Sequence, residues 1–235
     1  MSASALRIAS VYPELLGTYG DGGNVLVLER RLAWRDLPQE VVTVSLGDVL
    51  PTDCDLYVLG GGEDEAQLLA LDALRRSGLV DAAGRGAHVF AVCAGMQVCG
   101  TWFRSPGGPQ HEGLGLLDVT TERRAVRAVG DVVAAPAPAL DLPMLIGFEN
   151  HGGGSTLGPG AQSLAAVQQG VGNDGTGSEG ATQGRVVSTY LHGPVLAQNP
   201  ALADLLLTRA LGSALPPLDD RPIEELRRQR LRRSR

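Results

Sequence analysis

The first hundred residues alternate short apolar runs with amphipathic stretches, and this pattern constrains the fold more than any other feature. Four apolar runs predict strands, at 6–12, 41–46, 55–62 and 88–92. The segments 24–36 and 64–78 carry apolar residues at helical spacing and predict helices. Strands that alternate with helices pack as a mostly parallel sheet flanked by helices. The sequence therefore predicts an α/β fold.

The second half of the chain has a less regular pattern. Between about 104 and 137 no clear periodicity emerges, and 170–184 has the composition of a loop. Further strands are predicted at 142–148 and 185–191, and a last helix at about 199–211. A chain of 235 residues fits one α/β domain, which we place at 1–213. Residues 214–235 form a proline-containing link and an arginine-rich tail, predicted to be solvated and partly disordered.

Composition excludes several classes of protein. All basic residues are arginine, so a Walker A loop and a lysine Schiff base are both ruled out for this chain. A net charge of -6 argues against nucleic-acid binding. We find no stretch long and apolar enough to span a bilayer, no signal peptide, and no cysteine spacing typical of a zinc site. The sequence predicts a cytoplasmic protein with reduced thiols and no metal site.

Cys93 lies at the junction of a predicted strand and a predicted helix, in the stretch VFAVCAGMQVCG. Small residues after the cysteine allow the sharp turn of a nucleophile elbow, which lifts the side chain above the carboxyl edge of a sheet. The following helix N-terminus favours a thiolate. Cys93 is therefore the predicted nucleophile, whereas Cys54 and Cys99 are interpreted as core thiols.

A thiolate that attacks an amide produces an oxyanion, which requires preorganised donors. The backbone N–H of Ala94 is one predicted donor. The turn GGGED ends another strand, and its glycines allow close backbone approach, so Gly61 or Gly62 is predicted to supply the second donor.

The general base must come from the end of another strand, because sites in parallel sheets assemble at the carboxyl ends of strands. His192 follows the strand-like segment 185–191 and enters a turn, in STYLHGP. His151 in FENHGG also follows a strand and is the alternative base. His88 lies at the wrong end of its strand, and His111 lies in a loop.

These motifs resemble a known family. VCAGMQ, GGGED and YLHGP are similar to the nucleophile turn, oxyanion loop and catalytic histidine of class I glutamine amidotransferases, which have a flavodoxin-like architecture. More narrowly, the chain resembles the GatD family of glutaminase subunits of lipid II isoglutaminyl synthase, because it carries in this order YGDGGN, GGGEDEAQ, VCAGMQ, GFENHGG, GNDGTGSEGA and STYLHGP. The motifs span residues 19–194.

The resemblance implies Cys93 as nucleophile, His192 as general base and Arg127 as the anchor of the glutamine α-carboxylate. Gln97, one turn beyond the nucleophile, is a neighbour of the substrate pocket. Many members of the wider class carry a glutamate two residues after the histidine, where this chain has Pro194.

Two interpretations of that departure stay open. The site works either as a Cys-His dyad, as in the cobyric-acid-synthase-like branch, or with another carboxylate that orients the histidine. Asp21 and Glu149 are the two carboxylates considered, with Asp21 preferred because YGDGGN matches a family loop. Asp21 is equally well explained as a turn or cap residue before the helix at 24.

The family's reaction is hydrolysis of L-glutamine to glutamate and ammonia without a cofactor in this chain. Ammonia would pass to the Mur-ligase-like subunit MurT in a heterodimer, which uses ATP and Mg²⁺ to amidate D-glutamate in the lipid II stem peptide. Three alternatives stay open: a glutaminase subunit for another synthetase, such as a cobyric-acid-type amidation, a cysteine hydrolase of related fold, and a non-catalytic binding subunit.

Overall fold

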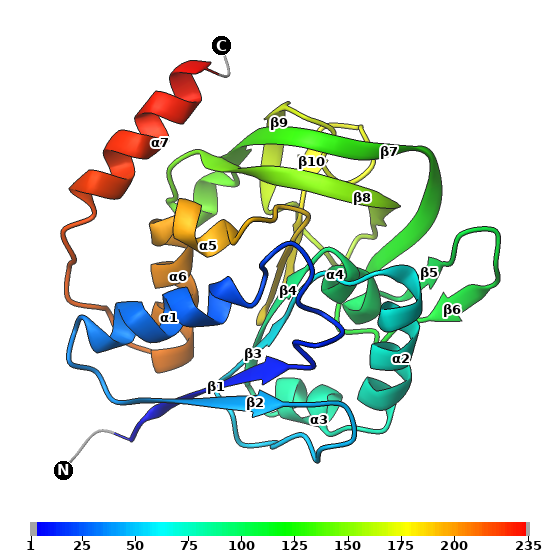
Figure 1. Cartoon of the computed structure of the whole chain (residues 1–235), viewed down its shortest axis with the longest axis horizontal. Helices are drawn as coiled ribbons and strands as arrows, with labels where there is room; N and C mark the ends of the chain where they lie inside the picture. The colour runs from blue at the N-terminus through cyan, green and yellow to red at the C-terminus, as the bar shows by residue number, and fades with distance from the viewer. Residues whose placement is uncertain (1–3, 234–235) are drawn as a thin grey trace.

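The computed structural model describes residues 4–233 and is built around two sheets (Figure 1). The first has five parallel strands and one antiparallel edge strand. In spatial order these are β11 (Ala181–Gln183), β12 (Val186–Thr189), β4 (His88–Val92), β3 (Leu56–Leu59), β1 (Leu6–Val11) and β2 (Gln39–Val44). Every residue of β3, β4 and β12 is buried, as expected for parallel strands covered on both faces. The predicted α/β fold with a mostly parallel central sheet is confirmed.

Helices cover both faces of this sheet (Figure 1). One face carries α1 (Gly23–Ala33), α5 (Val195–Gln198) and α6 (Pro200–Leu211). The other carries α2 (Asp64–Arg75), α3 (Leu79–Gly84) and α4 (Ala94–Cys99). In α1, residues at positions 25, 28 and 32 are buried, which is the helical spacing seen in the sequence. Burial of these apolar faces, at about 25 cal/mol per Å² removed from water, holds the layers together.

A second, mainly antiparallel sheet lies above the carboxyl ends of the parallel strands and was not predicted. Its order is β10 (Ser178–Glu179), β9 (Ala165–Gln169), β7 (Val119–Pro136), β5 (Trp102–Arg104) and β6 (Gln110–Glu112), with β8 (Leu145–Leu157) paired to β7 and a 3-10 turn η1 (Pro138–Leu140) between them. The FENHGG segment, expected to follow a strand, lies inside β8. Two short strands occur in the segment read as a loop at 170–184.

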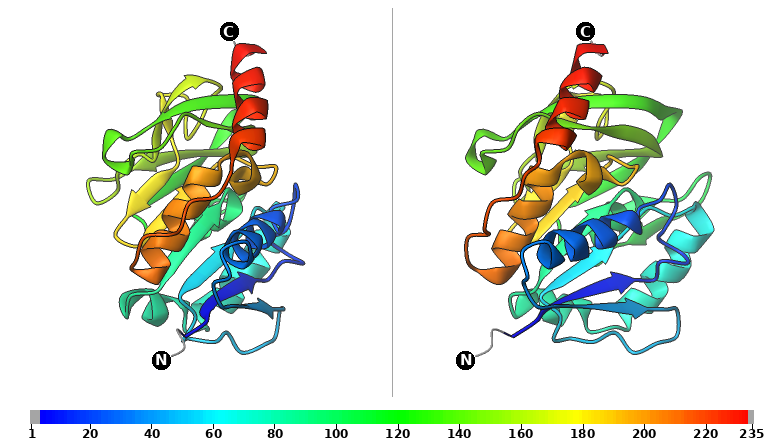
Figure 2. Two further views of the ribbon diagram at one scale, coloured as in Figure 1. Left: turned by 90° about the vertical axis from the view of Figure 1, so that its left-hand side faces the viewer. Right: turned by 60° about the vertical axis from the view of Figure 1, so that its left-hand side comes forward.

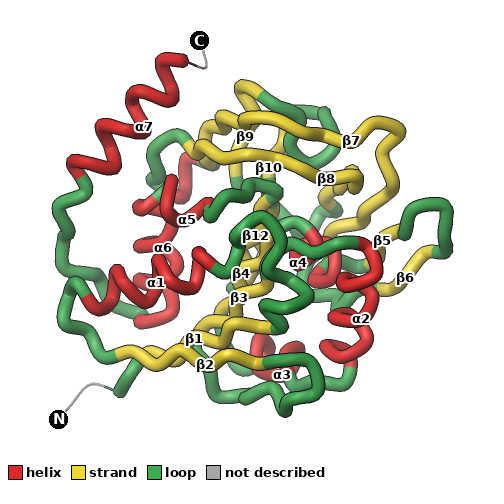
Figure 3. Tube along the Cα trace, viewed as in Figure 1, coloured by secondary structure: helices red, strands yellow, loops and turns green. Residues whose placement is uncertain are grey.

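The loop between β1 and α1 lies at the carboxyl edge of the first sheet. Figure 3 shows the loop between β1 and α1 passing over the ends of the parallel strands. This loop is pinned to the glycine turn after β3, because the Thr18 N–H donates to the Gly61 carbonyl at 3.0 Å. The loop therefore brings residues near 20 to the edge where β4 and β12 end.

The arginine-rich tail contains an ordered helix, α7 (Arg221–Arg233), where partial disorder was expected. It lies beside the ends of β7 and β8 (Figure 2). Arg227 is buried, and its guanidinium donates to the Asn199 side chain at 2.8 Å and to the backbone carbonyls of Met144 and Gln198. A buried guanidinium needs acceptors for its N–H groups, and these contacts supply three of them. Within residues 4–233, no helix is both long and apolar enough to cross a membrane.

Candidate active site

Cys93 connects β4 directly to α4 and has an unusual backbone. Its φ of 51° and ψ of -104° lie outside the regions that side chains normally allow, at a cost of about 1–3 kcal/mol. The Cys93 N–H donates to the Thr189 carbonyl at 2.9 Å, which fixes the turn to the neighbouring strand. A Cβ on Gly95 would come within 2.8 Å of the Leu59 carbonyl oxygen, so the turn requires glycine there. This strand-turn-helix geometry is the predicted nucleophile elbow.

His192 follows β12 and lies beside Cys93 at the same sheet edge. A Cβ placed on Gly61 would be 2.7 Å from His192 Cε1 and 3.4 Å from Cys93 Cβ, so both side chains meet at this glycine. The His192 Nδ1 lies 2.9 Å from Asp21 Oδ2 and 3.2 Å from Oδ1. The other ring nitrogen, Nε2, is buried and has no hydrogen-bond partner among the described residues. The ring is thus oriented through one nitrogen, and the second is available for proton transfer.

The charge state of His192 follows from its neighbours. Burial alone lowers the pKa of His192, but the hydrogen bond to Asp21 and the adjacent Cys93 outweigh burial and raise it to about 10. These contacts therefore favour the protonated form of the His192 ring. A cationic ring beside the sulfur stabilises a thiolate.

The structure changes the expected role of Gly61. Its N–H donates to Asp21 Oδ2 at 2.7 Å and so is not free to face an oxyanion. Gly62 and Ala94 both line the pocket above Cys93, and Ala94 is the first residue of α4, where an N–H has no acceptor within the helix. Gly62 and Ala94 remain the two predicted donors to the oxyanion. Gly61 instead leaves room for the His192 and Cys93 side chains, and its N–H holds Asp21.

A polar pocket opens above Cys93, and its lining includes Tyr19, Arg127 and Asn150. The Arg127 guanidinium lies at the pocket and donates through Nε to Asn150 Oδ1 at 2.5 Å and through one terminal nitrogen to the Asn150 carbonyl at 3.2 Å. Tyr19 and Asn150 were missed as site residues, although both lie in motifs singled out from the sequence. Arg127 lies at an irregularity in the β7–β8 pairing between residues 123 and 128, which interrupts the ladder beside the pocket.

His151, the alternative base, has both ring nitrogens engaged. Nδ1 lies 2.7 Å from the Gly153 carbonyl oxygen and Nε2 lies 3.3 Å from Glu149 Oε2. Its ring stacks on Tyr190, with centroids 3.8 Å apart and an interplanar angle of 16°. His151 borders the pocket, but these contacts are those of a packed core histidine.

Glu149, the alternative supporting carboxylate, is directed away from the base. It accepts from the backbone N–H groups of Val171 at 2.7 Å and Gly172 at 2.9 Å, as well as contacting His151. Burial acts to raise the pKa of Glu149, but the bond to His151 and the two backbone donors outweigh it and lower the pKa. The carboxylate that contacts His192 is that of Asp21.

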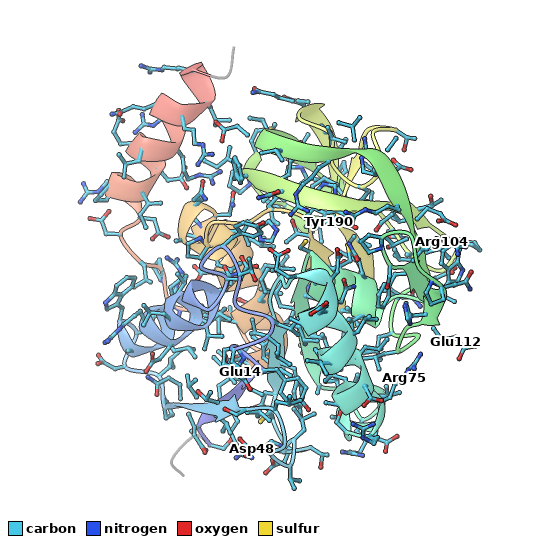
Figure 4. All side chains as sticks on the ribbon, turned by 45° about the vertical axis from the view of Figure 1, so that its right-hand side comes forward. Glu14, Asp48, Arg75, Arg104, Glu112 and Tyr190 are labelled. Carbon is cyan, nitrogen blue, oxygen red and sulfur yellow. The ribbon has the colours of Figure 1, made fainter. Side chains whose placement is uncertain are left out.

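Gln97 lies in α4 and borders the pocket, as predicted, but its amide is held in a buried network. Gln97 Oε1 accepts from Gln67 at 2.9 Å, and Nε2 donates to the Tyr190 hydroxyl at 3.1 Å. Tyr190 lies between the two sheets (Figure 4), and its hydroxyl also bonds Ser155 at 2.7 Å. This network fixes the wall of the pocket behind the nucleophile.

Across residues 4–233 no group of three or more His, Cys, Asp or Glu side chains is arranged to hold a metal ion. The reactive groups that the structure brings together at the base of the pocket are the sulfur of Cys93 and the imidazole of His192.

The chain is similar in sequence to glutamine amidotransferase proteins of known family. Residues 7–200 match the family model of the CobB/CobQ-like glutamine amidotransferase domain. The GatD subunit of lipid II isoglutaminyl synthase from Staphylococcus aureus is 33% identical, with 93% of this chain and 90% of the relative covered. The corresponding Streptococcus pneumoniae subunit is 32% identical, with 88% and 80% covered.

A solved structure described as a glutamine amidotransferase shares the fold, with a TM-score of 0.56 and 20% identity over 86% of this chain and 98% of that one. The family match and the GatD relatives show a glutamine-hydrolysing amidotransferase enzyme. The chain belongs to the CobB/CobQ-like glutamine amidotransferases, and within them to the family of the GatD subunits.

Proposed function

We propose that this chain hydrolyses L-glutamine through a thioester on Cys93 and supplies the ammonia to an ATP-dependent, Mur-ligase-like subunit that amidates D-glutamate in the lipid II stem peptide. The observation that carries the chemical part is the buried Cys93, His192 and Asp21 constellation at the base of a polar pocket. The relatives named as subunits of lipid II isoglutaminyl synthase support the choice of acceptor.

The site supports each step of amide hydrolysis. The Cys93 sulfur attacks the side-chain amide carbon, and the oxyanion is stabilised by the N–H groups of Ala94 and Gly62. The His192 imidazolium donates a proton to the leaving nitrogen, and ammonia departs. The neutral imidazole then takes a proton from water, which attacks the thioester and releases glutamate. Asp21 holds the ring in one orientation throughout.

The pocket suits the charges of a free amino acid. Arg127 provides a cationic group for the α-carboxylate, because a guanidinium can bind a carboxylate through two parallel hydrogen bonds. Glu63 and Asp64 line the same pocket and supply negative charge for the α-ammonium group. An amino acid held at both groups directs its side chain toward Cys93.

The proposed reaction includes an ATP-dependent step, which we assign to a partner subunit. Activation of a carboxylate with ATP needs a phosphate-binding site, and the chain has no lysine for a Walker A loop. We assign ATP and Mg²⁺ to the partner subunit, and the resemblance to the GatD family supports MurT as that partner. Since the partner consumes ATP, the complex works in the cytoplasm.

Reconstitution tests this proposal. The chain and the Mur-ligase-like subunit encoded in the same genome are incubated with lipid II, ATP and L-glutamine, and the stem peptide is analysed by mass spectrometry. The complex should amidate it, either subunit alone should not, and ammonium salts should bypass a Cys93→Ala lesion. Glutamine hydrolysis without amidation under any nitrogen source would favour a different synthetase partner, and no hydrolysis at all would favour a binding subunit.

A further inference from the structure

Tyr19 contacts both His192, the predicted base, and Arg127, the predicted carboxylate anchor. Its backbone has a φ of 62°, a left-handed conformation that costs a residue with a side chain about 1 kcal/mol or more. The residues on either side hold it there, because Thr18 and Asp21 both hydrogen-bond to Gly61. A strained residue anchored on both sides has its side-chain direction fixed by the backbone.

The ring of Tyr19 covers His192. Their ring centroids are 4.9 Å apart at an interplanar angle of 65°, an edge-to-face contact. Tyr19 is 40% exposed and lines the pocket, whereas His192 is fully buried and is not among the lining residues, so the phenol ring lies on the pocket side of the imidazole. The contact sets the position of the Tyr19 side chain relative to the base.

The hydroxyl of Tyr19 meets Arg127. A terminal nitrogen of the guanidinium donates to the phenol oxygen at 3.2 Å. A phenol that accepts this bond keeps its own proton for another acceptor, and Arg127 is the only partner of the hydroxyl among the described residues. Both groups line the pocket above Cys93, so this proton is available to a ligand.

We propose that Tyr19 binds the α-carboxylate of glutamine together with Arg127. The inference rests on the proposed glutaminase function and adds a specificity residue to it. The guanidinium and the phenol provide converging donors for one carboxylate, and the ring contact holds this anchor at a fixed position relative to His192. Tyr19 thereby aligns the substrate's amide with the nucleophile each time the carboxylate binds.

The test compares Tyr19→Phe with wild type on two substrates in the complex with the synthetase subunit. These are L-glutamine and its decarboxylated analogue, γ-aminobutyramide. A hydrogen bond to a charged group contributes enough to change kcat/KM about tenfold to a hundredfold. Tyr19→Phe should raise KM for L-glutamine by that factor with kcat nearly unchanged, and should leave kcat/KM for the analogue unaltered.

Tyr12→Phe is the matched control, since Tyr12 also has a left-handed backbone, with φ of 48°, but lines a separate hollow beside α2. It should behave as wild type on both substrates. An equal loss on both substrates, or no loss on L-glutamine, would overturn the role of Tyr19 while leaving the glutaminase assignment intact. A wild-type complex that does not hydrolyse glutamine would instead overturn the proposed function and this inference with it.

Discussion

Asp21 and His192 are 171 positions apart in the sequence, yet the carboxylate of one lies 2.9 Å from the imidazole Nδ1 of the other. Both side chains are fully buried. Two residues after the histidine this chain has Pro194, and the carboxylate that contacts the imidazole comes from Asp21 in the loop after β1. A buried carboxylate on the imidazole keeps one tautomer and one ring orientation.

Replacing Asp21 with Asn should lower kcat/KM for glutamine by about a hundredfold or more, since base catalysis depends on the oriented ring. It should also move the alkaline limb of the pH profile. In the native chain the hydrogen bond to Asp21 helps to raise the pKa of His192 to about 10, and without the carboxylate that pKa falls. The limb should therefore move to lower pH.

The matched control for this variant is Glu149→Gln, because Glu149 contacts His151 instead of His192. It should leave the alkaline limb in place. Steady-state glutaminase rates across the pH range provide the measurement, and a limb that does not move in Asp21→Asn would exclude a role for Asp21 in tuning the base. The contact between Asp21 and His192 also stabilises the folded protein. This contribution is fully present below about pH 6.5 and is lost as pH rises through about 10, because the pKa of His192 is raised in the folded state.

Alkylation should distinguish the three thiols. Burial raises the pKa of Cys99 to about 12, and burial also raises the pKa of Cys54 in spite of the nearby Arg7. Iodoacetamide should therefore label Cys93 first in the folded protein, because thiolate is the reacting species. Peptide mass spectrometry measures the order of labelling. Cys54→Ala and Cys99→Ala should retain rapid labelling, and faster reaction at either of those thiols in the native chain would argue against Cys93 as the nucleophile.

The two candidate histidines should respond differently to substitution. His192→Ala should lower kcat by about a hundredfold to ten-thousandfold, the usual contribution of a general base. His151→Ala should mainly lower the melting temperature, because loss of its buried hydrogen bonds costs about 1–3 kcal/mol and removes the stack on Tyr190. Rates per folded molecule and calorimetry separate the two effects. A greater rate loss in His151→Ala would reassign the base.

Glu179 provides a stability test away from the chemistry. Burial raises its pKa to about 7, while bonds from Thr189 and the Tyr190 N–H partly oppose this. Because the pKa of this carboxyl is raised in the folded state, the free energy of unfolding decreases as pH rises from about 4.5 to about 7. Glu179→Gln, which stays neutral, should have a higher melting temperature than wild type at pH 8 and a similar one at pH 5. A difference that does not vary with pH would contradict this assignment.

The sequence predicted the parallel sheet well, because its strands are continuous apolar runs. The predicted strand 88–92 is β4, and the following turn carries Cys93 as expected. The antiparallel sheet escaped prediction because β7 alternates poorly. Its segment ERRAVR is largely exposed, and the pairing with β8 is irregular between Arg123 and Ala128, which breaks the period of two.

Glycines follow the predicted strand 142–148, but β8 continues through them to Leu157. A Cβ on Gly152 would lie 2.6 Å from the Arg123 guanidinium, and one on Gly153 would lie 2.5 Å from Gln97 Nε2. These glycines serve close packing inside a strand, which composition alone cannot distinguish from a turn. Likewise the choice between Asp21 and Glu149 depends on how loops fold over the sheet edge, and no local pattern encodes that.

The most direct test of the account is the release of ammonia and glutamate from L-glutamine by the chain in complex with its synthetase subunit, compared between wild type and Cys93→Ala. The wild type should release both products, and the variant should release none above background while an unchanged circular dichroism spectrum confirms its retained fold. Equal release by Cys93→Ala would contradict the account, because the sulfur could then not be the nucleophile that forms the thioester.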